Sequence, residues 1–166
     1  MEATQFMSQG DSIRLENQLC FALYACSREI TKLYRPILEE LDLTYTQYIT
    51  MLSLWEQDHV TIKEIGARLY LDSGTLTPLL KKLEAMGLLL RIRDKHDERN
   101  VLIKLTEKGS LLKVKVMDIP EKLFHQIGMP AEAVASLRAQ IFDLLQKVQS
   151  ASKEAPKLDR GQAAAQ

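Results

Sequence analysis

The stretch TIKEIGARLYLDSGTLTPLLKKLEAMGLLLRIRDKHDERNVLIKL, residues 61–105, decides the fold of this chain. It opens with Thr61 and Glu64, which stand three residues apart before an apolar-periodic run and form a capping box that predicts a helix start. A turn over 71–74 separates this helix from a second amphipathic one, which we expect to end at Gly87. Two short helices joined by a tight, glycine-containing turn predict a helix-turn-helix.

A β-hairpin is expected directly after the second helix. Residues 88–93 and 99–105 are β-prone, apolar side chains alternate on the second arm, and a polar tip lies between the arms. A hairpin in this position is a wing. The sequence therefore predicts a mainly α fold with a small β-hairpin wing, a winged helix-turn-helix flanked by N- and C-terminal dimerisation helices.

The flanking helices are predicted from caps, apolar periodicity and proline breaks. On the N-terminal side we expect a helix over 12–36, capped by Ser12 and ended or kinked at Pro36, a short helix over 37–41, and a helix over 44–58 that starts at a capping box at Thr44. On the C-terminal side we expect a helix over 106–128, capped by Thr106 and broken at Pro120, and a last helix over 131–148. These helices carry apolar residues on too many faces for a monomer with so small a central core. We therefore expect a C₂ homodimer whose recognition helices read half-sites about 10 bp apart on a pseudo-palindromic operator in double-stranded DNA.

Three parts of the chain are expected to differ in how well they fold. Residues 1–11 are polar and small, and 151–166 have too few apolar residues to fold, so a mobile N-terminus and a disordered tail are predicted. Residues 12–150 then form one domain, with the DNA-binding lobe at about 44–106.

Charge and composition narrow the class of protein. The formal net charge is zero, yet residues 63–104 hold nine Lys/Arg against six Asp/Glu, a local excess that suits contact with DNA. No apolar run approaches the ~20 residues of a membrane span, and no secretion signal opens the chain, so no membrane partner is expected. Two cysteines make no disulfide framework, which favours a cytoplasmic protein with reduced thiols.

Candidate DNA contacts lie on the second helix and on the wing. Short hydroxyls reach base edges and phosphates, and lysines neutralise phosphate charge. The helix candidates are Ser73, Thr75, Thr77, Pro78, Lys81 and Lys82. On the wing, Arg99 is expected in the minor groove with Asp97 holding its guanidinium, and Arg91 and Arg93 are expected at phosphates. The alternative interpretation of the helix residues is a merely solvated face.

Two sets of motifs carry a family resemblance. LDSGTLTPLLK at 71–81, DER at 97–99 and LTEKG at 105–109 resemble the MarR family of dimeric winged-helix regulators, over roughly 12–150. LENQLCFALY at 15–24 narrows the resemblance to the OhrR branch, the organic hydroperoxide-sensing repressors. This resemblance implies a sequence-specific transcriptional repressor, not an enzyme and without a cofactor, that releases its operator when organic hydroperoxide oxidises Cys20.

The environment expected for Cys20 does not by itself activate a thiol. On residue pattern alone, a lone Cys on an apolar helix face is most often a small core residue. Cys20 is expected about two turns inside its helix, too deep for the helix dipole, and apolar neighbours disfavour a thiolate. The resemblance implies that Tyr34 and Tyr45 donate the stabilising hydrogen bonds. Fourteen helical residues between Cys20 and Tyr34 span ~21 Å, so the tyrosines must come from an antiparallel second copy.

Cys26 is not expected to pair with Cys20. Six residues place it about 9 Å along the helix and ~240° around it, beyond disulfide reach, so a buried structural role is predicted. The chain therefore resembles the one-cysteine type of OhrR. Its sulfenic acid would react with a small-molecule thiol, as the resolving partner, or with a backbone nitrogen, or would be over-oxidised.

Two other functions remain open at this point. A MarR-type regulator answering to a phenolic or other small ligand would keep the same fold, and a thiol peroxidase would use Cys20 for turnover. Against the enzyme, the sequence has no Cys-X-X-Cys and no Arg near Cys20 in a Pro/Thr-containing loop. The histidines His59, His96 and His125 are scattered without metal-ligand spacing, so no metal site is predicted.

Overall fold

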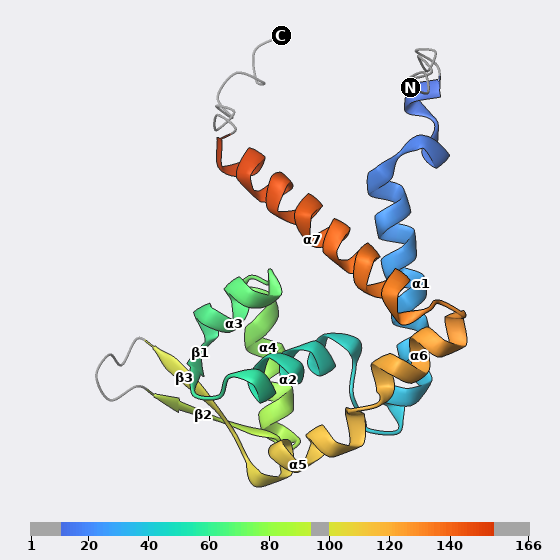
Figure 1. Ribbon diagram of the computed structural model, residues 1–166. Coiled ribbons are helices and arrows are strands. Elements are labelled where there is room, and N and C mark those ends of the chain that lie inside the picture. The colour runs from blue at the N-terminus through green and yellow to red at the C-terminus, as the bar shows by residue number, and fades with distance from the viewer. Residues whose placement is uncertain (1–10, 94–99, 155–166) are drawn as a thin grey trace. The chain divides into compact units, whose positions relative to one another are not determined.

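The structure is a computed structural model that describes residues 11–93 and 100–154 (Figure 1). The chain divides into two compact units, Met1–Ile119 and Pro120–Gln166. The described part is mainly helical with one small antiparallel sheet, which confirms the predicted winged-helix fold class. Within the described residues, no helix combines the length and the apolar character needed to cross a membrane.

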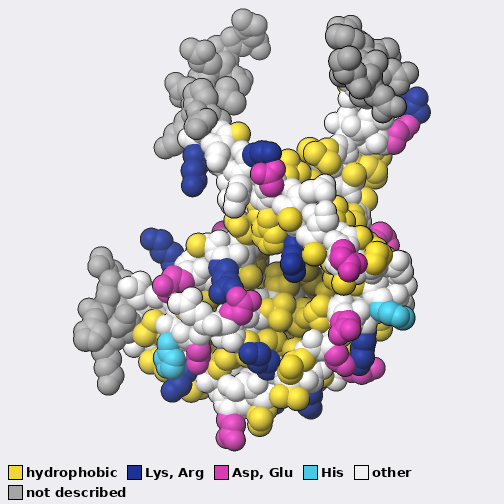
Figure 2. Space-filling view, in the orientation of Figure 1, with side chains coloured by type: hydrophobic (Ala, Val, Ile, Leu, Met, Phe, Trp, Pro, Cys, Tyr) yellow, Lys and Arg dark blue, Asp and Glu magenta, His cyan; other side chains and the backbone are white. Residues whose placement is uncertain are grey.

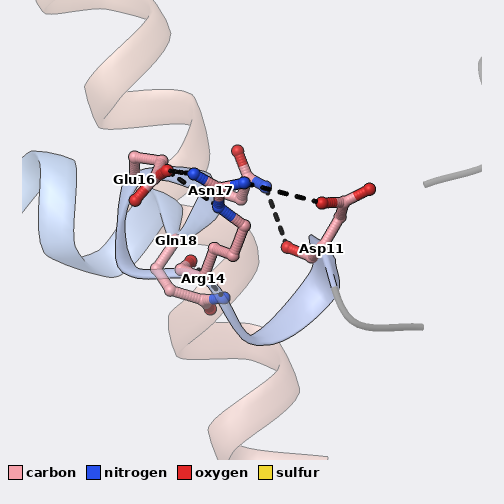
Figure 3. Close-up of polar contacts among 5 residues, drawn as sticks. All are labelled: Asp11, Arg14, Glu16, Asn17 and Gln18. Atoms are coloured by element: carbon pink, nitrogen blue, oxygen red, sulfur yellow. Dashed lines mark hydrogen bonds and ion pairs between the residues drawn. The ribbon is translucent and has the colours of Figure 1, made fainter. Parts of the chain in front are cut away.

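The first unit begins with two 3₁₀ turns, η1 (Asp11–Ile13) and η2 (Leu15–Asn17), and helix α1 (Leu19–Glu39) follows them. Side-chain amides fold this segment onto itself. Asn17 Nδ2 donates to the carbonyl of Asp11 at 2.8 Å (Figure 3). Gln18 Nε2 donates to the carbonyl of Ser12 at 2.6 Å. The prediction of a helix capped at Ser12 was therefore wrong, because these local bonds hold the backbone in separate tight turns and Gln18 is extended.

α1 runs without a break through Pro36, so the predicted end of the helix there and the separate helix 37–41 were also wrong. Pro36 is exposed, and the next turn is anchored by Leu38, which is 1% exposed. Apolar burial of this last turn outweighs the hydrogen bond that proline removes. The helix ends where Leu43 N donates to Leu38 O at 2.9 Å and Asp42 takes a positive φ of 56°.

Helix α2 (Tyr45–Glu56) begins at the predicted capping box. Thr44 N donates to Gln47 Oε1 at 2.8 Å, and Gln47 N donates to Thr44 Oγ1 at 3.3 Å. α2 supplies the centre of the core, where Met51 is fully buried. Residues of α2 lie against α1, α3, α4 and α5, so this helix joins the arm α1 to the DNA-binding lobe.

The helix-turn-helix consists of α3 (Ile62–Leu69) and α4 (Ser73–Ala85). Its first capping box is confirmed, since Thr61 N donates to Glu64 Oε2 at 2.7 Å and Glu64 N to Thr61 Oγ1 at 3.2 Å. Gly87 ends α4 as expected, at a positive φ of 70°. Asp72 caps α4 by accepting from the backbone N–H of Thr75 at 2.9 Å, an interaction the sequence interpretation did not assign.

The wing is the antiparallel pair β2 (Leu89–Arg93) and β3 (Val101–Leu105), in register from Leu89↔Leu105 to Arg93↔Val101. A third strand, β1 (Val60–Thr61), pairs with the other edge of β3, so the sheet order is β1-β3-β2. The sequence did not predict β1, because two residues are too few to show a strand period. The predicted polar tip of the wing lies outside the described residues.

Helix α5 (Glu107–Val116) starts at the predicted cap, where Gly109 N donates to Thr106 Oγ1 at 3.0 Å. Thr106 Oγ1 also donates to Gly87 O at 2.7 Å, which ties the start of α5 to the end of α4. The helix stops at Val116 and α6 (Ile119–Ile127) follows, so the predicted interruption near Pro120 is confirmed.

The second unit contains most of α6 and the long helix α7 (Ala131–Glu154). α7 starts where expected after Gly128, whose φ is +75°. It extends beyond the predicted end at residue 148, so the disordered tail expected from residue 151 was wrong for 151–154. The reason is local, because the segment after Val148 contains no helix breaker before Pro156.

Candidate functional site

Cys20 is the second residue of α1 and is exposed. This location corrects the expected depth of two turns, because the α-helix begins at Leu19 and not at Ser12. The first-turn N–H groups of a helix have no partners within the helix, and their partial positive charge favours an anion.

The surface around Cys20 is apolar and open. Hydrophobic side chains gather over the N-terminal half of α1 in the space-filling view (Figure 2). Leu19, Phe21 and Leu23 are exposed there. Tyr24 is exposed as well, but its hydroxyl accepts a hydrogen bond from Arg28 Nη1 at 3.2 Å, and the Arg28 guanidinium lies 5.5 Å from the ring centre.

Tyr34 and Tyr45 come together from two different helices. Tyr34 lies on α1 and is 7% exposed, Tyr45 is the first residue of α2, and their ring centres are 5.1 Å apart. Burial, with smaller contributions from Tyr48 and Tyr45, raises the pKa of Tyr34 to about 12. Burial also raises the pKa of Tyr45. Both phenols therefore stay protonated and able to donate a hydrogen bond throughout the physiological pH range.

The structure does not bring Cys20 to these tyrosines within one chain. Cys20 and Tyr34 occupy opposite ends of the continuous helix α1, and fourteen helical residues correspond to about 21 Å. The chain thus carries a thiol at one end of α1 and a pair of phenol donors at the other.

Tyr48 belongs to the same cluster and was missed by the sequence interpretation. Its ring centre lies 5.7 Å from that of Tyr34 and 6.4 Å from that of Tyr45, and its side chain is 1% exposed. The tyrosine spacing i, i+3 from Tyr45 on α2 was the signal available in the sequence, since such residues share a helix face.

Cys26 is exposed, so the predicted buried structural role is wrong for the isolated chain. It lies six residues after Cys20 on the same continuous helix. The two sulfur atoms stay apart, because positions i and i+6 of an α-helix are not within disulfide distance of each other.

The expected DNA-contact residues of α4 extend from its first residue, Ser73, to Lys82 in its last turn. Ser73, Thr75, Pro78, Lys81 and Lys82 are exposed, and Thr77 is partly buried. Two of the hydroxyls are engaged locally. Thr75 Oγ1 donates to Asp72 Oδ2 at 2.9 Å, and Thr77 Oγ1 donates to Ser73 O at 2.7 Å. Their oxygens keep lone pairs for base or phosphate donors, and the two lysine ammonium groups give this face positive charge.

A groove of about 450 Å³ lies between α3, the start of α4 and β3. Its lining includes Ser73 and Thr77 together with Lys63, an exposed cation of α3 that the sequence interpretation did not single out. Lys63 was missed because only the second helix and the wing were considered for contacts.

The wing arginines differ in their surroundings. Arg91 has a side chain 22% exposed, its Nη1 lies 3.8 Å from Glu84 Oε2, and its backbone N–H donates to Glu84 Oε1 at 3.0 Å. Arg93 is exposed. Arg93 therefore suits a phosphate contact better than Arg91 does. Asp97 and Arg99, expected at the minor groove, lie outside the described residues.

The chain is similar in sequence and in fold to known proteins. The family described as "Transcriptional regulator SarA/Rot" matches residues 32–116. The organic hydroperoxide resistance transcriptional regulator of Bacillus subtilis (strain 168) is 51% identical over 136 residues, covering 82% of this chain and 92% of that protein. Reduced AbfR bound to DNA superposes with a TM-score of 0.73 at 34% identity, covering 89% of this chain and 100% of AbfR.

AbfR, a protein of Staphylococcus epidermidis, has also been solved in a disulfide-formed state. That structure superposes with a TM-score of 0.58 at 33% identity, covering 89% of this chain and 97% of AbfR. The similarity thus includes proteins solved on DNA and proteins solved in more than one redox state.

Proposed function

Because the chain belongs to the MarR-type winged-helix transcriptional regulators of the SarA/Rot family, we propose that it is a dimeric, sequence-specific repressor that senses organic hydroperoxides through Cys20 and then releases its operator. It acts in the cytoplasm, without enzymatic turnover and without a cofactor. The observation that carries the proposal is the placement of an exposed thiol and a buried pair of protonated phenols at opposite ends of α1.

The sensing site forms between two copies. An antiparallel second α1 places its Cys20 against Tyr34 and Tyr45 of the first chain, and the twofold axis makes two such sites. This pairing also covers the exposed apolar side chains Leu19, Phe21 and Leu23 beside the thiol. Residues 12–150 act together as the regulatory domain, with the DNA-binding lobe at about 44–106.

The chemistry is a two-electron oxidation of the sulfur. The Cys20 thiolate attacks the terminal oxygen of an organic hydroperoxide, the O–O bond breaks, and the alkoxide leaves with the O–O electron pair and takes a proton to become an alcohol. Cys20 is then a sulfenic acid. Tyr34 and Tyr45 stabilise the anionic sulfur by donation, since neither phenol is deprotonated at neutral pH.

Resolution uses a thiol from outside the protein. Cys26 is held away from Cys20 by α1, so a small-molecule thiol attacks the sulfenic sulfur and releases water, which leaves a mixed disulfide. A bulky adduct between the paired helices shifts one DNA-binding lobe relative to the other. A 10⁴-fold loss of operator affinity requires the free energy of DNA binding to differ by about 5.5 kcal/mol between the reduced and the oxidised protein.

DNA binding uses α4 in the major groove and the wing beside it. Ser73, Thr75, Thr77 and Pro78 approach bases and phosphates, and the cations are Lys81, Lys82, Arg91 and Arg93. Arg99, held by Asp97, enters the minor groove. Support comes from the exposed Ser73 and Thr75 at the start of α4, from the exposed Lys81 and Lys82 further along it, and from the similarity to AbfR, which was solved on DNA. Two lobes related by a twofold axis read a pseudo-palindromic operator.

A second candidate function is regulation by a small ligand, as in a phenol-responsive regulator of the same fold. One observation favours it. A pocket of about 1170 Å³ lies among the end of α1, the start of α2, the end of α4 and α5, with apolar walls such as Leu41 and Leu112 and cations such as Lys82. The carboxylates of Glu40, Asp42 and Glu107 line the same pocket, so its charges balance and its apolar walls are what would hold a phenolic or other small ligand.

Fluorescence anisotropy of labelled pseudo-palindromic DNA tests the proposal. The wild-type dimer is expected to release DNA after cumene hydroperoxide and a small thiol, while Cys20→Ser binds DNA normally and does not respond. Mass spectrometry of the treated protein should find the modification on Cys20. Release of Cys20→Ser by peroxide, or release by a phenolic acid with Cys20 unmodified, contradicts the sensing role and favours the ligand-regulated alternative.

A further inference from the structure

The hydroxyl of Tyr48 is buried and has no hydrogen-bond partner among the residues that the structure describes. A buried hydroxyl without a partner destabilises the fold, and buried polar groups are nearly always paired in native proteins. Phenylalanine would fill the same volume without that cost. The tyrosine at this position therefore calls for a partner that the isolated chain, in this arrangement, does not provide.

Two phenols surround Tyr48, and one of them is better placed as its partner. The ring of Tyr34 is nearer, at 5.7 Å and tilted by 37°, while the ring of Tyr45 is at 6.4 Å and tilted by 51°. The pKa shifts do not decide between the two, because Tyr48 raises the pKa of Tyr34 while Tyr45 raises that of Tyr48. The shorter distance between ring centres selects Tyr34.

We propose that Tyr48 is a positioning residue of the sensor, whose hydroxyl donates to Tyr34 Oη while Tyr34 donates to the Cys20 sulfur of a second copy. The proposal rests on the function proposed above. Among the described residues of the single chain, the Tyr48 hydroxyl meets no other group in hydrogen-bond geometry. The sulfur of a second copy draws the Tyr34 hydroxyl toward it, and the accompanying shift of the two rings brings the lone pairs of Tyr34 Oη within reach of the Tyr48 proton.

The consequence is a stronger donor at the sulfur. A hydroxyl that accepts one hydrogen bond donates the next one more strongly, because the bonds in a chain polarise each other. Burial strengthens this effect by excluding water from the tyrosine cluster. Tyr48 thus stabilises the thiolate through Tyr34 without contacting it.

Alkylation of Cys20 by iodoacetamide as a function of pH measures thiolate stability in the intact dimer. The Cys26→Ser background leaves Cys20 as the single thiol. Tyr48→Phe is expected to raise the pH midpoint of the rate by about half a unit, and so to slow alkylation near neutral pH about threefold. Tyr34→Phe should have a larger effect, and the double variant should match Tyr34→Phe alone, because Tyr48 acts only through Tyr34.

The matched control is Tyr70→Phe, which removes a hydroxyl from an exposed tyrosine at the end of α3. It should leave the midpoint unchanged. In the dimer Tyr48→Phe removes the proposed hydrogen bond to Tyr34 Oη, so its melting temperature should be slightly lower than that of its parent, and the pH midpoint is the readout that tests the positioning role.

An unchanged midpoint in Tyr48→Phe overturns the proposal, whatever the melting temperature of that variant. If the midpoint shifts of Tyr34→Phe and Tyr48→Phe add in the double variant, Tyr48 does not act through Tyr34, and that part of the proposal is overturned. Neither outcome contradicts the proposed function as long as the Cys26→Ser parent still releases DNA after cumene hydroperoxide. A parent whose DNA affinity ignores peroxide overturns the proposed function instead, and a shifted midpoint in Tyr48→Phe would then still support the hydrogen-bond chain.

Discussion

The rings of Tyr34 and Tyr45 lie 5.1 Å apart although the two residues belong to different helices. The turn between α1 and α2 makes this contact possible, because Leu38 and Leu43 bury the end of α1 against the core and so hold the start of α2 beside it. The pair gathers two protonated phenols at one end of α1, while Cys20 stands at the other end.

The tyrosine pair should control the rate of sensing and not DNA binding. Tyr34→Phe or Tyr45→Phe should slow oxidation of Cys20 by cumene hydroperoxide at least about tenfold, since a hydrogen bond to a charged group contributes about 1.5–3 kcal/mol. Stopped-flow titration of the remaining thiol measures the rate. Tyr70→Phe is the control. Equal oxidation rates in all three variants would exclude the pair from the sensor.

Stability should fall at high pH through Tyr34. Its pKa is raised to about 12 in the folded chain, above the value of about 10 in an unfolded chain. Between these values the unfolded state loses the proton and the folded state keeps it, so stability that is complete below pH 10 is lost as pH rises toward 12. Urea unfolding at about pH 9 and about pH 11, on either side of the lower value, should show a smaller loss for Tyr34→Phe than for wild type. An equal loss would argue against a perturbed Tyr34.

The lysines of α4 should contribute salt-dependent affinity. Replacing Lys81 and Lys82 by alanine should weaken DNA binding for every sequence alike, and should reduce the slope of log K against log salt by about 0.9 for each phosphate that is no longer neutralised. Anisotropy titrations at several salt concentrations provide the slopes. Lys153→Ala, at the exposed end of α7, is the control. Weaker binding to only one operator sequence would instead indicate base contacts.

Gly109 should tolerate no side chain. A Cβ at this position would overlap the backbone oxygen of Leu88, and Gly109 O accepts from Trp55 Nε1 at 2.8 Å, so α5 cannot move away without breaking its hydrogen bond to α2. Gly109→Ala should lower the free energy of unfolding by more than about 3 kcal/mol. Chemical denaturation measures this, with Ser110→Ala as control. A decrease below about 1 kcal/mol would show that α5 shifts freely.

Much of the DNA-binding lobe was predictable because its signals are local. The boxes at Thr44 and Thr61 each link a side chain to a backbone group three residues away, and a span of four residues contains the whole interaction. Gly87 ends α4 for a similarly local reason, its positive φ. Alternating apolar residues likewise indicated the wing.

The errors concern segments whose structure depends on competing interactions. The sequence predicted Ser12 as a helix cap, but the side-chain amides of Asn17 and Gln18 bind carbonyls of the preceding turn, so the helix begins later in the chain. Pro36 looked like an end, but the burial of Leu38 carries α1 past it. Each outcome is a balance of energies that a pattern of residue types does not weigh.

The sequence by itself determined the winged helix-turn-helix and the family, and it singled out Cys20 as the candidate sensor, because caps, periods and motifs are encoded within short spans. Only the tertiary structure decided that Cys20 occupies the first turn of α1, that Tyr34 and Tyr45 meet, and that Tyr48 lies buried beside them, its hydroxyl unpartnered among the described residues. The physical reason is that contact and burial between separate helices follow from the packing of the whole core, in which each side chain competes with every other for the same space.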